Sequence, residues 1–313
     1  MSASAGADAA SAQRDALVRA MPWVFVLIWS TGFVVARLAM PHSPPFAFLV
    51  MRFALSALCF AIWIMLVRAA WPSGRTQWGH LLVTGAFMQA GYLGGVWAAI
   101  RHGLGAGTVA LLVGLQPVLT ALWISRGAAS TGGAAVSGRR WLGLLLGFAG
   151  LALVVWGKLG VGEVGAANLA MAAVALVSIT IGTLYQKRFV APCDVRSASA
   201  VQMLAGIVVC LPFALLEPGV MEWHRDLVIA MAWSVAVLTL GGSSLLYLLI
   251  QRGEATAVTS LLYLVPPCTA LMAWALFGES FTPLMMLGMA LTVAGVALVV
   301  RPAHGIEAKE TPP

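Results

Sequence analysis

Long apolar segments alternate with short polar connections along the whole chain. A helix that crosses a bilayer needs about 20 mostly apolar residues. Ten segments approach or reach this length: residues 21–39, 46–67, 80–100, 107–125, 141–157, 166–185, 197–216, 227–250, 256–277 and 283–300. Apolar and polar residues do not alternate within runs such as 142–156, so the pattern indicates helices and not the strands of a transmembrane barrel. The pattern predicts an all-α integral membrane protein with ten transmembrane helices.

The connections between these segments are too short to fold as separate domains. The longest one, residues 126–140, consists mostly of Gly, Ala and Ser. We expect residues 1–20 to form a flexible cytoplasmic tail and residues 302–313 to form a second tail. A cleaved signal peptide is the alternative for the first segment, but no small-residue cleavage motif precedes the proline-rich turn at 41–45.

The two halves of the chain resemble each other. A shift of 145 residues places nine residues of the fifth segment on identical residues of the tenth, including Gly143 on Gly288 and Gly150 on Gly295. A shift of 149 residues places Pro117 in the fourth segment on Pro266 in the ninth. We therefore predict two repeats, residues 21–157 and 158–301.

Each predicted repeat contains five helices, and five is an odd number. The second repeat must then begin on the opposite side of the membrane from the first, which makes an inverted repeat. In such a protein either side can open when the two halves exchange conformations, as in transporters with alternating access. The alternative is a gene duplication without transport.

The composition and the distribution of charge support this membrane class. Of the 313 residues, 61% are hydrophobic and 9% are charged, against about 25% charged residues in an average soluble domain. With the N-terminus placed inside, thirteen Lys and Arg residues lie in inside segments and three in outside loops. Basic residues favour the cytoplasmic side, so both termini are predicted to be cytoplasmic. The net charge of +7 therefore reflects orientation in the membrane and not nucleic-acid binding.

Several short motifs resemble those of a known family. They are LIWSTGF at 27–33, PFAFLVMR at 45–52, LVP at 264–266 and FGE at 277–279. In this order, and together with ten segments and a duplication, they resemble the EamA branch of the drug/metabolite transporter superfamily over residues 21–301. One departure is visible: the Gly-Glu pair of the family is missing after the fourth segment.

The resemblance implies a transporter in the bacterial inner membrane, where the ten-helix members mainly export amino acids and related metabolites. Other members carry drugs, vitamins or nucleotide sugars, so a broad drug or metabolite exporter is the alternative. The resemblance implies a small-molecule substrate and the lipid bilayer as partners. It does not decide between a monomer and a homodimer.

None of the eleven acidic residues lies near the middle of a predicted span. Transporters use buried carboxylates to relay protons or bind cations, so we expect facilitative transport without carboxylate-based ion coupling. Arg52 is the deepest basic residue, about 10 Å beyond Pro45 at 1.5 Å per residue. Its side chain either reaches toward the headgroups and backbone carbonyls, or binds a carboxylate of the substrate.

The candidate substrate-binding residues are neutral polar or aromatic groups near the middle of spans. They are Trp29, Gln89, Tyr92, Gln116, Ser244, Tyr247 and Tyr263. An amide such as that of Gln89 or Gln116 is costly in lipid, whereas a single Ser or Thr often bonds to its own helix. Pro117, Pro266 and Pro267 free backbone carbonyls and are candidate hinges.

Two other classes of function fit the sequence poorly. A membrane enzyme would need catalytic side chains that converge at mid-depth, and the spans carry no such group of carboxylates or imidazoles. An ion channel would need rings of charge or filter loops. We expect no enzymatic activity, no cofactor and no metal site.

Overall fold

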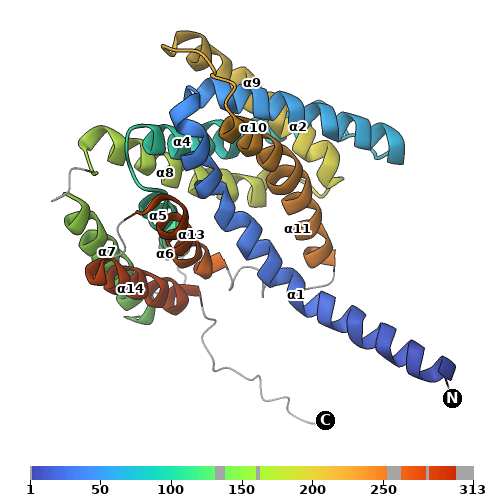
Figure 1. Cartoon of the computed structure of the whole chain (residues 1–313), viewed down its shortest axis with the longest axis horizontal. Helices are drawn as coiled ribbons and strands as arrows, with labels where there is room; N and C mark the ends of the chain where they lie inside the picture. Colours follow the sequence, from blue (N-terminus) through green and yellow to red (C-terminus); the bar gives the residue numbers. More distant parts are fainter. Residues whose placement is uncertain (1, 131–137, 160–162, 252–261, 280–281, 301–313) are drawn as a thin grey trace.

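The computed structural model describes residues 2–130, 138–159, 163–251, 262–279 and 282–300, and every regular element in these ranges is helical. The α-helices are α1 Ser2–Ala39, α2 Pro45–Val67, α3 Arg75–Gly85, α4 Gly94–Arg101, α5 Ala106–Val113, α6 Gln116–Ser130, α7 Gly138–Leu159, α8 Ala166–Phe189, α9 Val195–Leu216, α10 Arg225–Ala232, α11 Gly242–Gln251, α13 Val265–Phe277 and α14 Pro283–Val300 (Figure 1). Two π-helical segments, η2 Ala86–Leu93 and η3 Trp233–Gly241, lie between α-helices, and η1 Met40–His42 and η4 Leu262–Leu264 are 3-10 turns. The predicted all-α class is confirmed.

Eight of the ten predicted spans appear as helical stretches long and apolar enough to cross a membrane. They are Ala20–His42, Pro45–Val67, Arg75–Arg101, Ala106–Trp123, Trp141–Lys158, Ala166–Phe189, Val195–Leu216 and Arg225–Leu245. The shorter apolar helices Val265–Phe277 and Pro283–Leu298 occupy the ninth and tenth positions. The beginning of the ninth predicted span, residues 256–261, lies outside the described residues.

Two helices are longer than the apolar pattern predicts. Helix α1 begins at Ser2, so the tail that we expected to be flexible is helical, in keeping with the high helix propensity of its alanines. This part of α1 extends away from the bundle (Figure 1). Helix α6 continues to Ser130 and shortens the predicted connection at 126–140.

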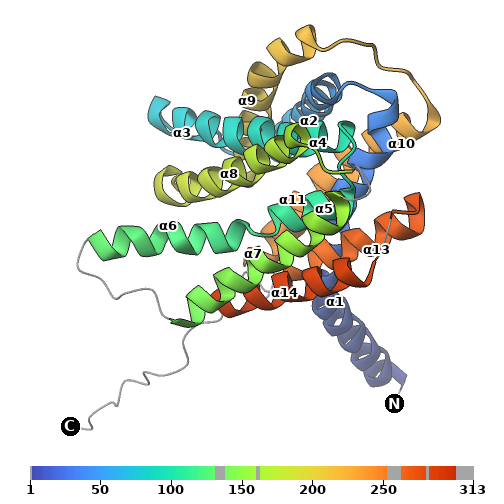
Figure 2. The same cartoon turned by 90° about the vertical axis from the view of Figure 1, so that its left-hand side faces the viewer.

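The most extensive helix contacts join α2 to α9 and α7 to α14. Each pair contains a helix from the first repeat and its counterpart from the second, and the two pairs lie on opposite sides of the bundle in both views (Figures 1 and 2). The remaining helices lie between them, with α1 packed against α13, α10 and α11. Contacts between the repeats therefore form the two outer walls of the bundle.

Glycines on α7 and α14 show how the repeats are related. A Cβ atom on Gly150 would collide with the carbonyl oxygen of Gly288, and one on Gly295 would collide with that of Gly143. The two contacts run in opposite directions along the helices, so the pair is antiparallel. They also exchange under the 145-residue repeat, in which Gly143 corresponds to Gly288 and Gly150 to Gly295. This exchange is the mark of a pseudo-two-fold axis between two inverted repeats, as predicted.

Large apolar side chains cover much of the outer surface of the bundle. Leu66, Trp156 and Leu216 are among the most exposed of them. A soluble monomer rarely exposes apolar patches of this extent, so this surface fits a bilayer. The interior is built around buried aromatic residues such as Phe48 and Trp97, whose rings stack with centroids 4.4 Å apart.

Candidate functional site

The two π-helical segments occupy equivalent places in the two halves. Segment η2 interrupts the third span between α3 and α4, and η3 interrupts the eighth between α10 and α11. A π-helix changes the direction in which the following side chains point and leaves carbonyl groups free, which is why such segments are frequent at functional sites. Both segments line the same central cavity.

The central cavity has a volume of about 200 Å³ and is lined by residues of both halves. Its walls come from α1, α2, η2, α4, α8, α9, η3 and the beginning of α11. The polar residues and tryptophans among them are Trp29, Arg52, Gln89, Tyr92, Trp97, Ser199, Thr239 and Ser243. The remaining lining residues are apolar or glycine, so the cavity suits a solute with both apolar and polar parts.

Three of the candidate residues predicted from the sequence line this cavity: Trp29 on α1, and Gln89 and Tyr92 on η2. Gln89 and Tyr92 are three residues apart and face the same space, as expected from their spacing. The ring of Trp29 packs against the ring of the buried Phe25, with centroids 5.4 Å apart.

The other predicted residues lie elsewhere or outside the described side chains. The Gln116 side-chain nitrogen donates to Thr183 Oγ1 of α8 at 3.1 Å, away from the cavity. Ser244 lines a neighbouring cavity, and its hydroxyl donates to the Leu240 carbonyl at 2.5 Å. The side chains of Tyr247 and Tyr263 lie outside the part of the chain that the structure describes.

Arg52 is the only charged residue among those that line the central cavity. Its side chain is only 8% exposed, and its Nη2 donates to Thr239 Oγ1 of η3 at 3.3 Å. Its Nε is buried without a hydrogen-bond partner. The guanidinium lies 6.0 Å from the centroid of the Trp97 ring. The side chain thus points into the protein interior and not toward the headgroups.

The three candidate hinge prolines lie where helices restart. Helix α5 ends at Val113, and Pro117 stands in the first turn of α6. Pro266 and Pro267 stand in the first turn of α13, directly after the 3-10 turn η4. A first-turn proline removes no helical hydrogen bond, so each restart is locally stable. The interruptions touch each other, because a Cβ on Gly114 would lie 2.9 Å from Pro266 Cγ. Movement of these helices at the restarts stays a prediction.

A second cavity of about 240 Å³ adjoins the central one. The two share Phe60 and Ser243 as lining residues. The second cavity extends to Asp194 and Arg196, at the connection between α8 and α9. The Arg196 guanidinium pairs with Asp194 at 2.8 Å and lies 5.5 Å from the centroid of the Trp63 ring. The second cavity therefore lies between the central cavity and this end of the bundle.

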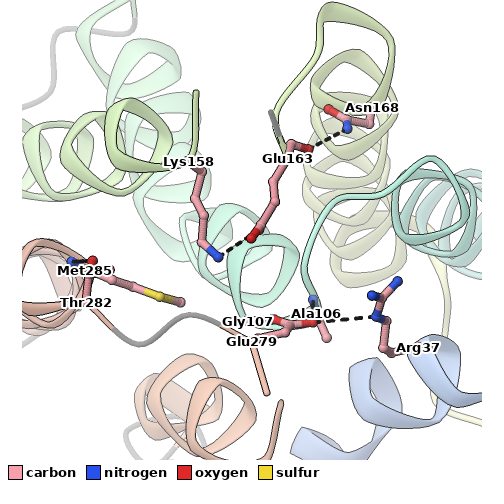
Figure 3. A network of polar contacts seen from close by, with 9 residues as sticks. All are labelled: Arg37, Ala106, Gly107, Lys158, Glu163, Asn168, Glu279, Thr282 and Met285. Atoms are coloured by element: carbon pink, nitrogen blue, oxygen red, sulfur yellow. Dashed lines mark hydrogen bonds and ion pairs between the residues drawn. The ribbon is translucent and has the colours of Figure 1, made fainter. Parts of the chain in front are cut away.

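Polar contacts tie the helices together at the opposite end of the bundle (Figure 3). The Glu279 carboxylate accepts hydrogen bonds from the backbone N–H groups of Ala106, at 2.9 Å, and Gly107, at 3.5 Å, and lies 3.8 Å from Arg37 Nε. It thereby joins α1, the N-terminus of α5 and the segment after α13. A carboxylate is stabilised at a helix N-terminus because free N–H groups and the helix dipole both favour negative charge.

Two further groups of contacts strengthen this end. Lys158 donates to Glu163 at 2.7 Å, and Asn168 on α8 donates to the carbonyl of His102 at 3.1 Å. Glu217, after α9, accepts from the backbone N–H groups at the start of α2 at 2.9 and 3.2 Å. Burial raises the pKa of the Glu217 carboxyl, although these N–H groups act in the opposite direction. The contacts cross between the two halves and hold the helices together at this end of the bundle, which we call the closed end.

Among the described residues, one group has the spacing of metal ligands: His42, His224 and Asp226, with ligand atoms within 4.8 Å of one another. The two imidazole rings stack with centroids 4.3 Å apart, and His224 Nδ1 accepts a hydrogen bond from the backbone N–H of Asp226 at the start of α10. Capping of α10 accounts for the contact of His224 with Asp226, and the expectation of no metal site stays a prediction.

Most hydroxyl groups near mid-span bond to their own helix, as anticipated for single Ser and Thr residues. Examples are Ser30 to Val26, Thr180 to Leu176 and Ser243 to Thr239. Sequence reasoning missed Trp97 and Thr239 as cavity residues. The repeat could have identified Thr239, because a shift of 150 residues places it on Gln89.

Comparison with known proteins agrees with this architecture. The uncharacterized transporter YvbV of Bacillus subtilis is 26% identical over 281 residues, covering 88% of each chain. A probable amino-acid metabolite efflux pump of Salmonella typhimurium is 23% identical over 285 residues, covering 88% of this chain and 92% of the pump. A solved crystal structure with 18% identity matches 90% of this chain and 96% of its own with a TM-score of 0.60, which shows the same fold.

The resemblance drawn from the sequence motifs is confirmed by a match to each half of the chain. The two matched ranges agree with the two repeats of the helical bundle. The protein belongs to the EamA-like transporter family, which matches residues 21–156 and again residues 167–301.

Proposed function

We propose that this protein exports amino acids and related small metabolites across the bacterial inner membrane by alternating access, as a monomer or a homodimer. The observation that carries the proposal is the central cavity between the two repeats, closed at one end by the Glu279 contacts and continued toward the other by the second cavity. A site near mid-membrane that communicates with one side at a time is what alternating access requires.

The size of the cavity supports small metabolites as substrates. Its volume of about 200 Å³ is below the roughly 300–1,000 Å³ typical of sites for drug-sized ligands. Hydrogen-bonding groups from Gln89, Tyr92 and Ser199 lie among apolar side chains, as suits a zwitterion with an apolar side chain. A broad drug exporter is the second candidate, and the largely apolar lining favours it. The efflux named for the Salmonella typhimurium relative supports export as the direction.

The charges around the cavity support facilitative transport. The described acidic residues lie in connections, at helix ends or in the part of α1 before the first span, and none lines the cavity. A carboxylate that carries protons or sodium ions with the solute is therefore missing from the described wall. We propose that net flux follows the substrate gradient, and that both termini and the end reached by the second cavity face the cytoplasm.

Purified protein in liposomes tests the proposal with a panel of labelled amino acids, each measured against protein-free liposomes. We expect saturable uptake of at least some amino acids that is independent of proton and sodium gradients at zero membrane potential. Transport of dye-like drugs without any amino acid would favour the second candidate. Uptake that depends on an imposed ion gradient would contradict the facilitative mechanism.

A further inference from the structure

The guanidinium of Arg52 is buried in the wall of the central cavity with part of its hydrogen-bonding capacity unused. An arginine side chain carries five N–H donors and a permanent positive charge. Among the described residues this side chain forms one hydrogen bond, from Nη2 to Thr239 Oγ1 at 3.3 Å, and its Nε has no partner. The Thr239 hydroxyl itself donates to the Ser234 carbonyl, so a neutral oxygen is all that η3 offers to Arg52.

The positive charge of Arg52 is also unpaired within the described protein. The ion pairs among the described residues do not include Arg52, and its cavity lining contains no acidic side chain. An uncompensated charge inside a protein is strongly destabilising. In membrane proteins such residues face a cavity and mark a path for substrates or ions. The missing partner of Arg52 is therefore an anion that enters the cavity.

Packing holds the guanidinium in position for such a partner. The Trp97 ring, 6.0 Å from the guanidinium, favours a cation at its face, and Phe48 stacks on this same ring with centroids 4.4 Å apart. Arg52 lies about two helical turns beyond Pro45, the first residue of α2. The side chain is 8% exposed, so the guanidinium lies inside the bundle and not in the headgroup region.

We propose that Arg52 binds the carboxylate of the transported solute. A carboxylate accepts charge-assisted hydrogen bonds from a guanidinium, often two in parallel, and these are the strongest hydrogen bonds that the side chain can form. The proposal rests on the proposed function, because it takes the central cavity as the place where the solute sits. It also narrows the substrate class to monocarboxylates, including zwitterionic amino acids.

The rest of the cavity determines what the other end of the solute carries. A second carboxylate would find no other basic side chain among the lining residues. An ammonium group would find the side-chain oxygen of Gln89 and the face of Trp29, both of which attract a cation. Amines and amides lack the group that Arg52 needs and leave its charge unpaired. The site therefore selects solutes mainly by their carboxylate, and the other groups of the solute have a smaller effect on affinity.

The test compares three forms of each amino acid in the transport panel: the amino acid, its primary amide and the acid without its amino group. Binding to the purified protein is measured at equilibrium in detergent. We expect the amide to bind about 10- to 100-fold more weakly than the amino acid, the range for lost charge-assisted hydrogen bonds. This comparison uses the unaltered protein and does not depend on any variant folding.

Variants then assign the effect to Arg52. In Arg52→Gln the carboxylate forms should lose affinity to the level of the amides, while the affinity for the amides stays the same. A purely structural role would weaken both forms equally. Arg52→Lys keeps the charge and should retain part of the preference. Arg188→Gln is the matched control, because it removes one positive charge from an exposed site at the end of α8.

The outcomes separate this inference from the proposed function. Binding of carboxylates without transport of any amino acid would overturn the proposed function alone. Transport of amino acids and their amides with equal affinity would overturn the carboxylate site alone. Failure of every carboxylate to bind, or equal losses for both forms in Arg52→Gln, would also overturn it.

Discussion

The close contact of α7 with α14 makes a quantitative prediction for Gly150→Ala. The new Cβ would lie 2.5 Å from Thr292 Oγ1 and 2.8 Å from the backbone nitrogen of the same residue. Ordinary contacts begin at 3.4 Å, so the two helices would have to separate by roughly 0.9 Å to clear Thr292 Oγ1, and further to clear the still closer carbonyl oxygen of Gly288. Overpacking of this kind costs about 1–3 kcal/mol, and the higher helix propensity of alanine offsets at most about 1 kcal/mol. We expect a net destabilisation of about 1–2 kcal/mol.

Unfolding the purified protein by heat or denaturant in mild detergent measures this difference in stability. Gly157→Ala is the matched control on the same helix, because its Cβ would meet only the flexible end of Leu284, at 3.1 Å. The control should be as stable as the unaltered protein or slightly more stable. Since α7 and α14 line neither cavity, transport per folded molecule should keep its KM in both variants.

The pseudo-two-fold relation adds a second condition. Gly295 is the counterpart of Gly150, and a Cβ there would lie 2.6 Å from the backbone nitrogen of Gly147. Gly295→Ala should therefore destabilise the protein by a similar amount. Equal stability of Gly150→Ala and Gly157→Ala would refute the packing argument. A large loss for only one of the two counterparts would refute the symmetry.

Three other predictions concern the moving parts and the ends of the bundle. Pro117→Ala should reduce the transport turnover while leaving the unfolding temperature unchanged, because the proline lies where α6 begins. Unchanged transport with lowered expression would contradict a role of Pro117 as a hinge. Asp194→Ala removes the N-cap of α9 and should cost about 1 kcal/mol at pH 7. Hydrogen bonds from Arg196 lower the pKa of Asp194, so its stabilisation is complete above the usual carboxyl pKa and lost as the pH falls below it. The difference in unfolding temperature between the two proteins should therefore shrink at pH 3, and a constant difference would contradict this cause. Glu279→Ala should open the closed end, so that a cysteine introduced at Gly32 in the cavity wall reacts several-fold faster with an impermeant thiol reagent added from that side; an unchanged rate would contradict the role of Glu279.

Much of the fold could be predicted from the sequence, because lipid forces every span to be helical and apolar. The predicted ends of the second and fifth spans agree with the apolar helical stretches Pro45–Val67 and Trp141–Lys158 to within one residue. Gly143 and Gly147 are four residues apart, a spacing of small residues that favours close helix contact, and both lie where α7 meets Gly295 of α14. These features depend on local composition and spacing, which a single sequence contains.

The cavity could be predicted only in part, because it depends on how helix faces are oriented. The π-helical segments η2 and η3 shift the register of side chains that a regular helical period would assign. Gln116 was expected in the cavity on the ground that an amide avoids lipid, but a hydrogen bond to Thr183 satisfies the same requirement between two helices. For Arg52, depth in the membrane allowed either contact with the headgroups or binding of a substrate carboxylate. Its burial and its contact with Thr239 of η3, which depend on the neighbouring helices, favour the second role.

The contacts at the closed end also bear on the balance between the two states of an alternating-access cycle. In a perfectly symmetric inverted repeat, each contact that closes one side has an equal counterpart that closes the other. Here the counterpart of Glu279 under the 149-residue shift is Ser130, since the Gly-Glu pair is missing after the fourth segment. A carboxylate at a helix N-terminus stabilises by about 0.3–1 kcal/mol, and up to about 2 kcal/mol when partly buried. Under the proposed mechanism, this one contact is therefore expected to favour the state closed at the Glu279 end by about 2- to 30-fold in population. A solute that binds both states equally would leave this bias unchanged. Under the proposed mechanism we therefore expect the protein without solute to rest with its cavity directed toward the Asp194 end.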